Sequence, residues 1–174
     1  MEAYEKPKKI SLKIASAAIL TAVTVVMTIA VRIPVAPTRG YINLGDMAIY
    51  FTALSFGPLA AFTTGGLGTA IADIISGYPQ WALFSFLIHG LQGLAVGFLY
   101  KALPQKSANI TAFAAGTAIM AGGYFLTGSI MSGTGAALAE IPGNIVQNLA
   151  GIIGGNLLYT AVKKAYPPFA NYRW

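Results

Sequence analysis

Residues 14–31 read IASAAILTAVTVVMTIAV, a run without a charged side chain. A helix rises 1.5 Å per residue, so this run extends about 27 Å, close to the thickness of the hydrocarbon core of a bilayer. Lys8, Lys9 and Lys13 precede the run as in a signal peptide, but no convincing cleavage site follows it. The run is therefore predicted to be a first membrane-spanning helix.

The composition extends this prediction to the whole chain. Of 174 residues, 56% are hydrophobic and 9% are charged, which is more apolar surface than a single soluble core hides. Cysteine is absent, so disulfides, zinc-thiolate sites and thiol nucleophiles are excluded. The net charge of +6 comes from basic residues at the ends of apolar runs, which favours a topological role over nucleic-acid binding.

Apolar runs bounded by Gly, Pro and charge predict an all-α integral membrane bundle in a single domain, 1–174. The predicted spans are 10–31, 44–57, 58–77, 80–103, 108–131 and 140–163, with one longer loop at 32–43. The division between the second and third spans rests on Gly57-Pro58, because Pro suits the first position of a new helix and breaks the interior of an old one.

The basic residues support six spans. With six, two basic residues (Arg32 and Arg39) lie on one side of the membrane, and the other nine lie opposite: Lys6, Lys8, Lys9, Lys13, Lys101, Lys106, Lys163, Lys164 and Arg173. Such a bias follows the positive-inside rule and predicts that both termini are cytoplasmic. If the second and third spans were one helix, Lys101, Lys106 and the basic C-terminus would lie on the opposite side of the membrane from the N-terminal lysines.

Polar residues at membrane depth are costly and commonly mark a functional site. Three acids, Asp46, Asp73 and Glu140, are predicted near the outer ends of their helices. Two further sets each share one helical face, and they are Trp81, Ser85, His89 and Gln92, and Glu140, Asn144, Gln147 and Asn148. Faces that enter from the same side predict a cleft for a small hydrogen-bonding ring, with Tyr78, Trp81 and Tyr124 available for stacking.

Each candidate also has a structural interpretation. Asp46 and Glu140 suit helix N-termini, and Asp73 could pair with Arg32 or Arg39. His89 and the amides could serve interhelical hydrogen bonds, and the aromatic residues could form an interfacial belt.

Missing motifs argue against an enzyme. The chain has no G-x-x-x-x-G-K-[ST] phosphate loop, no H-E-x-x-H, no G-x-S-x-G and a single histidine. We therefore expect no catalytic residues, no metal site and no cofactor on this chain.

Four stretches together resemble the S components of energy-coupling factor (ECF) transporters over nearly the whole chain. They are the first helix with Ala18-x-x-x-Ala22, the stretch GYINLGD at 40–46, the stretch SGYPQW at 76–81 leading to HGLQG at 89–93, and EIPGNIVQ at 140–147. The branch that looks most similar is the HmpT and PdxU type, which is associated with hydroxymethylpyrimidine or vitamin B6 compounds.

The resemblance implies a six-helix fold in the prokaryotic cytoplasmic membrane, an outward pocket and a first loop that closes over the substrate. It implies a transmembrane coupling subunit, EcfT, docked at Ala18 and Ala22, and two cytoplasmic ATPases that use ATP. It places seven residues at or near the pocket, namely Asn43, Tyr78, Trp81, His89, Glu140, Asn144 and Gln147.

We consider three functions for this chain. The first is a vitamin-capturing subunit without chemistry of its own. The second is a stand-alone, proton-coupled secondary transporter that uses Asp73 or Glu140, although the chain is short for one and shows no inverted repeat. The third is a small intramembrane enzyme that pairs His89 with Glu140 as acid and base.

Overall fold

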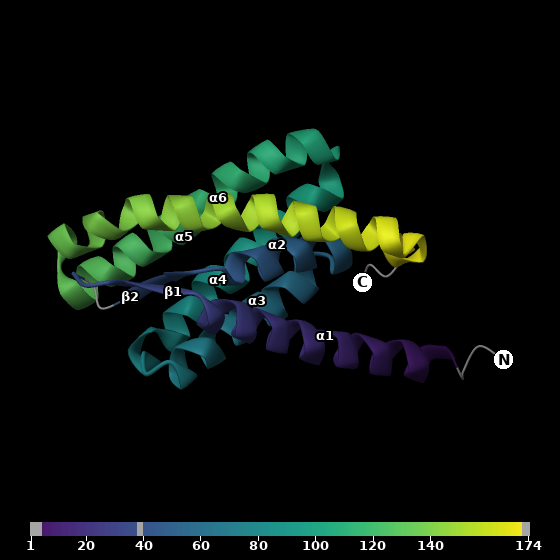
Figure 1. Ribbon diagram of the computed structural model, residues 1–174, viewed down its shortest axis with the longest axis horizontal. Coiled ribbons are helices and arrows are strands. Elements are labelled where there is room, and N and C mark those ends of the chain that lie inside the picture. The colour runs from purple at the N-terminus through teal and green to yellow at the C-terminus, as the bar shows by residue number, and fades with distance from the viewer. Residues whose placement is uncertain (1–4, 38–39, 172–174) are drawn as a thin grey trace.

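The computed structural model describes residues 5–37 and 40–171, and most of them form long helices packed side by side (Figure 1). The elements in chain order are α1 (Glu5–Ala30), β1 (Arg32–Val35), β2 (Gly40–Asn43), α2 (Gly45–Phe56), α3 (Pro58–Ile75), α4 (Pro79–Ala102), α5 (Gln105–Ser132), α6 (Thr134–Ala165) and a terminal 3₁₀ helix, η2 (Pro167–Asn171). The fold class is helical, as predicted.

The predicted loop at 32–43 contains a small β-hairpin, which the sequence pattern did not indicate. β1 and β2 pair antiparallel, with Ile33 opposite Ile42 and Pro34 opposite Tyr41. Pairing of the two strands satisfies backbone groups that would otherwise lack hydrogen-bond partners. Pro34 is tolerated because a two-stranded sheet consists of edge strands.

The chain reverses direction between α2 and α3. Gly57 has a φ of 97°, a conformation that favours glycine, and Pro58 occupies the first turn of α3. Gly65 then lies against Ile49, so α3 returns alongside α2.

Glycine allows α3 and α4 to approach each other closely. A Cβ atom added at Gly93 would lie 2.6 Å from the Ala61 carbonyl oxygen, and one added at Gly97 would lie 2.5 Å from the Pro58 Cα atom. Close backbone approach through small residues is a common way for membrane helices to associate.

One end of each helix from α1 to α6 lies beside the hairpin. Gly151 and Gly155 of α6 lie against Asp46 and Tyr50 of α2, so α6 and α2 run in the same direction. The C-terminal ends of α1, α3 and α5 and the N-terminal ends of α2, α4 and α6 therefore meet beside the hairpin (Figure 1). We call this the hairpin end.

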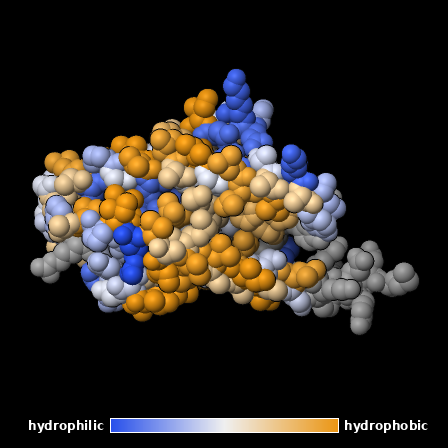
Figure 2. Space-filling view, in the orientation of Figure 1, coloured by the Kyte–Doolittle hydropathy of each residue, from blue (hydrophilic) through white to orange (hydrophobic). Residues whose placement is uncertain are grey.

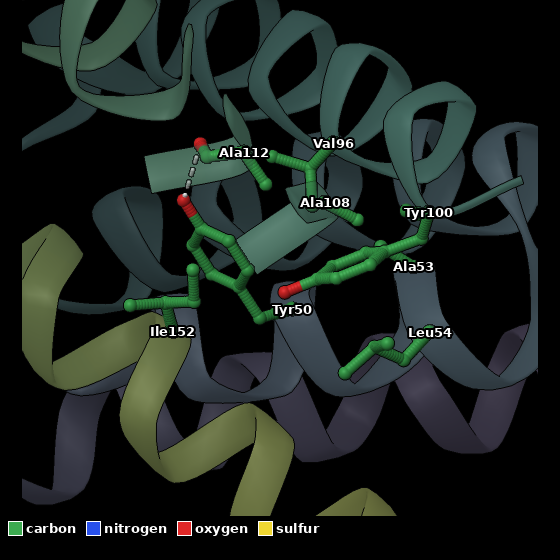
Figure 3. Close-up of a cluster of buried hydrophobic side chains, with 9 residues drawn as sticks. Tyr50, Ala53, Leu54, Val96, Tyr100, Ala108, Ala112 and Ile152 are labelled. Atoms are coloured by element: carbon green, nitrogen blue, oxygen red, sulfur yellow. Dashed lines mark hydrogen bonds between the residues drawn. The ribbon is translucent and has the colours of Figure 1, made fainter. Parts of the chain in front are cut away.

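An apolar core fills the opposite half of the bundle. Tyr50 projects from α2 between α5 and α6, among Ala112 and Ile152 (Figure 3). Tyr100 from α4 belongs to the same cluster. Large side chains from α2, α4 and α6 pack against alanines in this cluster, which joins five helices.

The outer surface is apolar along the bundle. Figure 2 shows hydrophobic side chains over the middle of one face and hydrophilic ones toward both ends. Among the described residues, five helices are long and apolar enough to cross a membrane. α2 is shorter: its 12 residues extend about 18 Å, less than the roughly 30 Å of a hydrocarbon core.

Candidate functional site

A pocket lies at the hairpin end, between the hairpin and every long helix. Its lining consists of Thr28, Val35, Gly40, Tyr41, Ile42, Asn43, Thr69, Asp73, Trp81, Ser85, His89, Met120, Tyr124, Glu140, Asn144 and Gln147. The free volume is about 30 Å³, which is room for roughly one or two water molecules. A ring-sized solute therefore enters this pocket only after some of the lining residues move apart.

The floor of the pocket is a buried contact between Asp46 and His89. Asp46, in the first turn of α2, is completely buried, and its Oδ1 atom lies 3.4 Å from His89 Nδ1. His89 Nδ1 is also 2.8 Å from Gln92 Oε1. Because Nδ1 faces two acceptors, it carries a proton, and Nε2 is the ring nitrogen that this pairing leaves available.

A network of amides continues below the floor. Gln92 donates to Asn148 Oδ1 at 2.9 Å, and Asn148 Nδ2 donates to Thr117 Oγ1 at 2.7 Å. The Tyr50 hydroxyl lies 2.8 Å from the same Asn148 oxygen. Hydrogen bonds between helices therefore occupy Gln92 and Asn148, the role that the structural interpretation assigned to the amides.

Two hydrogen bonds between described residues join the hairpin to the helices at the pocket. The Tyr41 hydroxyl donates to Asp73 Oδ1 at 2.7 Å, and the Asn43 backbone N–H donates to Gln147 Oε1 at 2.7 Å. The Tyr41 hydroxyl is the donor of this pair and the Asp73 carboxylate is the acceptor. Gln147 also donates to Asp46 Oδ2, which links the hairpin to the floor.

Asp73 accepts a hydrogen bond from Tyr41, and its alternative pairing with Arg32 or Arg39 stays a prediction. Of the two candidate arginines, Arg32 lies on β1 with an exposed side chain, and Arg39 lies outside the described residues.

Aromatic rings form one wall. The Trp81 and Tyr124 rings are 5.8 Å apart at an interplanar angle of 53°, and the His89 ring is 5.7 Å from Tyr124. Ser85 Oγ and the Tyr124 hydroxyl are 2.8 Å apart, which fixes the Tyr124 ring in place. A planar ring stacked on this wall would gain apolar contact.

Three buried polar atoms of residues that line the pocket have no hydrogen-bond partner among the described residues. They are Asp73 Oδ2, Trp81 Nε1 and Asn144 Nδ2, and they come from α3, α4 and α6. Their side chains are 4%, 3% and 7% exposed. A buried polar group without a partner is costly, so one acceptor and two donors at a single pocket indicate a place for a polar ligand.

Comparison with known proteins identifies the family. Residues 9–164 match the family described as "ECF-type riboflavin transporter, S component". The chain belongs to this family of S components. It is a multi-pass membrane protein and not an enzyme, as predicted from the sequence.

Three relatives place this S component more narrowly. It is 42% identical over 143 residues to a Pyrococcus woesei protein described as an "uncharacterized protein in gap 3'region", across 82% of this chain and 96% of the relative. It is 32% identical over 154 residues to the "thiamine precursor transporter HmpT" of Lactococcus lactis, across 87% and 88% of the two chains. A "UPF0397 protein" of Streptococcus agalactiae is 31% identical over 57% of this chain and 54% of its own length. The S component therefore lies near the HmpT branch, as its motifs indicated.

The structure places most of the predicted site residues of the S component around the pocket. Nine of them line it: Asn43, Asp73, Trp81, Ser85, His89, Tyr124, Glu140, Asn144 and Gln147. Asp46, Gln92 and Asn148 belong to the floor and the network beneath it. Tyr78 lies beside the hairpin, with its ring centroid 5.0 Å from that of Tyr41.

Several lining residues were not predicted. Tyr41 is the important one, because it joins the hairpin to Asp73. Its position two residues before Asn43 would have indicated a shared strand face, had the loop been recognised as a strand. Thr28 was not predicted, because threonines in membrane helices commonly bond a carbonyl of their own helix and so do not indicate a site. Its hydroxyl bonds the Thr24 carbonyl in this way.

The two predicted docking residues of the S component lie on a different surface. Ala18 and Ala22 are exposed on α1 and line an apolar groove of about 660 Å³ between α1 and α3. Thr63, Leu67 and Ile71 form the opposite side of this groove.

Proposed function

We propose that this S component captures a small water-soluble vitamin or vitamin precursor from outside the cell for ATP-driven uptake by partner subunits. The observation that carries this proposal is the convergence of Asp73 Oδ2, Trp81 Nε1 and Asn144 Nδ2, all buried and unpaired among the described residues, on one pocket. A ligand that bonds all three would remove their desolvation cost.

Compounds of the vitamin B6 or hydroxymethylpyrimidine type are the proposed substrates. The relative named as a thiamine precursor transporter supports a pyrimidine, whereas the family description names riboflavin. The Trp81–Tyr124 wall offers one aromatic stacking surface, which suits a single planar ring.

The hairpin is the proposed lid. The free volume of about 30 Å³ is far below the several hundred cubic ångströms of typical ligand pockets, so the hairpin must lift to admit a solute. Two hydrogen bonds, Tyr41 to Asp73 and Asn43 to Gln147, hold it closed.

Six membrane crossings with both termini cytoplasmic are the proposed topology. α2 is short, but its N-terminus lies beneath the hairpin, and we propose that the two together complete one crossing. The distribution of lysine and arginine in the sequence supports this arrangement over five crossings. The hairpin end then faces outward.

The proposed partners are a transmembrane coupling subunit, EcfT, and two cytoplasmic ATPases. The chain has no phosphate loop, so the ATP hydrolysis that this proposal requires is assigned to other subunits. The apolar groove at Ala18 and Ala22 is the proposed docking surface for the coupling subunit. We propose no cofactor on this chain.

The direct test is to purify the S component in detergent, denature it, and identify any released small molecule by mass spectrometry. Candidate vitamins are then titrated by calorimetry. Tight stoichiometric binding without chemical change supports the proposal. Uptake by this chain alone in ATP-free vesicles under a proton gradient would favour a secondary transporter, and a modified ligand would favour an enzyme.

The absence of cysteine makes the topology testable by single-cysteine labelling. Gly77 and Gly133 lie in connections at the hairpin end, and Pro104 lies in the connection between α4 and α5. Because Gly77 and Gly133 have positive φ angles, the cysteines are placed at their exposed neighbours Gln80 and Thr134. We expect an impermeant thiol reagent to label Gln80→Cys and Thr134→Cys in intact cells and Pro104→Cys only after lysis. The reverse pattern would place the pocket on the cytoplasmic side.

A further inference from the structure

The side chain of Gln147 bridges the junction between the hairpin and α2. β2 ends at Asn43 and α2 begins at Gly45, so the chain passes from one element to the other at Leu44. On the hairpin side, the Asn43 backbone N–H donates to Gln147 Oε1 at 2.7 Å. On the helix side, Gln147 Nε2 donates to Asp46 Oδ2. One amide therefore uses its acceptor for the hairpin and its donor for the helix.

Two glycines hold this part of α6 close to the junction. Gly143 and Gly151 lie four residues before and four residues after Gln147, on the same face of α6. A Cβ atom added at Gly143 would lie 2.5 Å from Ile42 Cδ1. One added at Gly151 would lie 2.5 Å from Asp46 Cβ. Close contact on both sides of Gln147 keeps its amide within reach of the two elements that it joins.

Asp46 in turn controls the surroundings of His89, the single histidine of the chain. His89 Nδ1 is 2.8 Å from Gln92 Oε1 and 3.4 Å from Asp46 Oδ1. This carboxylate oxygen has no hydrogen bond to a described residue, so a small movement of Asp46 toward the ring would offer Nδ1 a second acceptor. The bond from Gln147 to Asp46 Oδ2 opposes that movement. The orientation of the His89 ring therefore depends on Gln147, although the two side chains are joined only through Asp46 among the hydrogen bonds described.

We infer that Gln147 is a positioning residue, which holds Asp46 and through it presents His89 Nε2 to the ligand while the hairpin is closed. His89 lines the pocket, and Nε2 is the ring nitrogen that Asp46 and Gln92 leave available. Lifting the hairpin withdraws the Asn43 N–H, so the movement that opens the pocket also frees the Gln147 amide and loosens Asp46. This inference rests on the proposed function and adds to it a coupling between the hairpin and the ligand-binding orientation of His89.

The single histidine allows a direct test by NMR. The S component is purified through a tag without histidine, labelled with histidine that carries a heavy nitrogen isotope, and measured without ligand. Gln147→Met keeps the length of the side chain but makes neither hydrogen bond. We expect it to shift the Nδ1 resonance of His89, because Asp46 is no longer held. If Gln147 only ties the hairpin to α6, the resonance keeps its position, and the inference is overturned.

Asn156→Leu is the matched control. Asn156 is another amide of α6, and it donates to the Tyr100 hydroxyl and to the Ile152 carbonyl, but it does not line the pocket. Its loss removes a hydrogen bond between helices, as Gln147→Met does, yet should leave the His89 resonances and the ligand affinity unchanged. A shift of equal size in Asn156→Leu would show that the resonance reports general loosening of the bundle, which would overturn the inference.

Ligand titration tests whether Gln147 acts through His89. The probe is whichever of hydroxymethylpyrimidine, pyridoxine and riboflavin binds the unmodified S component after it is stripped of ligand. Gln147→Met should weaken binding about 10- to 100-fold. His89→Asn keeps a donor close to the position of Nδ1 and removes Nε2, so it should also weaken binding, by about 10-fold. The double variant should bind at least about fivefold more tightly than the product of the two single losses predicts. Losses that multiply within about twofold would mean that Gln147 acts independently of His89 and would overturn the inference.

A second variant covers the case in which Gln147→Met does not fold, as judged by size-exclusion elution and thermal unfolding. Gln147→Asn keeps the amide but is one methylene shorter, so it cannot reach both partners, and it should also shift the His89 resonance. An unchanged resonance in whichever variant folds overturns the inference and leaves vitamin capture standing. If no probe binds and denaturation releases no ligand, vitamin capture itself fails, whereas the ligand-free NMR comparison still decides whether Gln147 positions His89.

Discussion

Trp81 combines two functions that a substitution can separate. Its ring forms the aromatic wall with Tyr124, and its buried Nε1 atom has no hydrogen-bond partner among the described residues. We expect Trp81→Phe to keep stacking but lose the donor, which weakens ligand binding about 10-fold, since one neutral hydrogen bond contributes roughly 1 to 1.5 kcal/mol. Calorimetry with the co-purified ligand measures the change, and Trp81→Ala should weaken binding further. Unchanged affinity in Trp81→Phe would mean that Nε1 does not face the ligand.

The Asp46–His89 pair should matter for stability beyond its contribution to the pocket. Both side chains are almost completely buried, so removing one leaves the other without its partner. Asp46→Ala and His89→Ala should each destabilise the protein by about 3 kcal/mol or more, and the double variant should lose less than the sum. Thermal unfolding of the four proteins in detergent without ligand measures this coupling. Strictly additive losses would show that the two side chains do not interact.

The limit of sequence reasoning is visible at Asn144 and Asn148. They lie one turn apart on the same face of α6, and the spacing predicted correctly that both point inward. Asn148 meets Gln92, Tyr50 and Thr117, whereas Asn144 Nδ2 reaches the pocket without a partner. Periodicity fixes the face of a helix, but which neighbour lies opposite depends on how other helices pack.

At the scale of elements, long apolar runs correctly predicted helices, but the hairpin was predicted as a loop. Its strands have four residues each, and Pro34 and Pro37 interrupt the segment, so neither alternation nor length reached what a strand normally shows. The hairpin is stabilised by residues from distant parts of the chain. Asp73 accepts a hydrogen bond from Tyr41, and Gln147 accepts one from Asn43. Tertiary contacts of this kind leave no local signature.

Loosening the hairpin should accelerate ligand release. Tyr41→Phe removes the hydroxyl that donates to Asp73 and keeps the ring beside Tyr78. We expect the dissociation rate constant to rise about 10-fold with little change in the association rate constant, because hydrogen bonds to charged groups contribute roughly 1.5 to 3 kcal/mol and part of this is regained by solvation. Stopped-flow measurements of ligand exchange separate the two rate constants.

Tyr78→Phe is the control for this experiment. It deletes a hydroxyl for which the described residues show no hydrogen bond and preserves the ring contact with Tyr41. Its dissociation rate constant should match that of the unmodified protein. Equal acceleration in both variants would mean that ring packing, and not the bond to Asp73, keeps the hairpin closed.

At the scale of the whole molecule, the polar pocket and the apolar groove are separate surfaces. The pocket lies at the hairpin end, whereas the groove follows α1 and α3 along the bundle. Among the described lining residues, Thr28 represents α1 and Thr69 the middle of α3, and each hydroxyl bonds a carbonyl of its own helix. Ligand capture and partner docking should therefore respond to different substitutions.

Ala18→Trp tests this separation. Ala18 is exposed in the groove, and an indole there would fill the space proposed for a helix of the coupling subunit. We expect transport by the complete complex to be abolished, while the isolated S component binds its ligand with unchanged affinity. Ile19→Trp is the control, since Ile19 is 64% exposed on α1 but does not line the groove, and this variant should transport normally. Uptake assays in cells that express all subunits, together with calorimetry on the purified chains, decide the outcome. Weakened binding in Ala18→Trp would show that α1 supports the pocket itself, and equal loss of transport in both variants would place docking outside the groove.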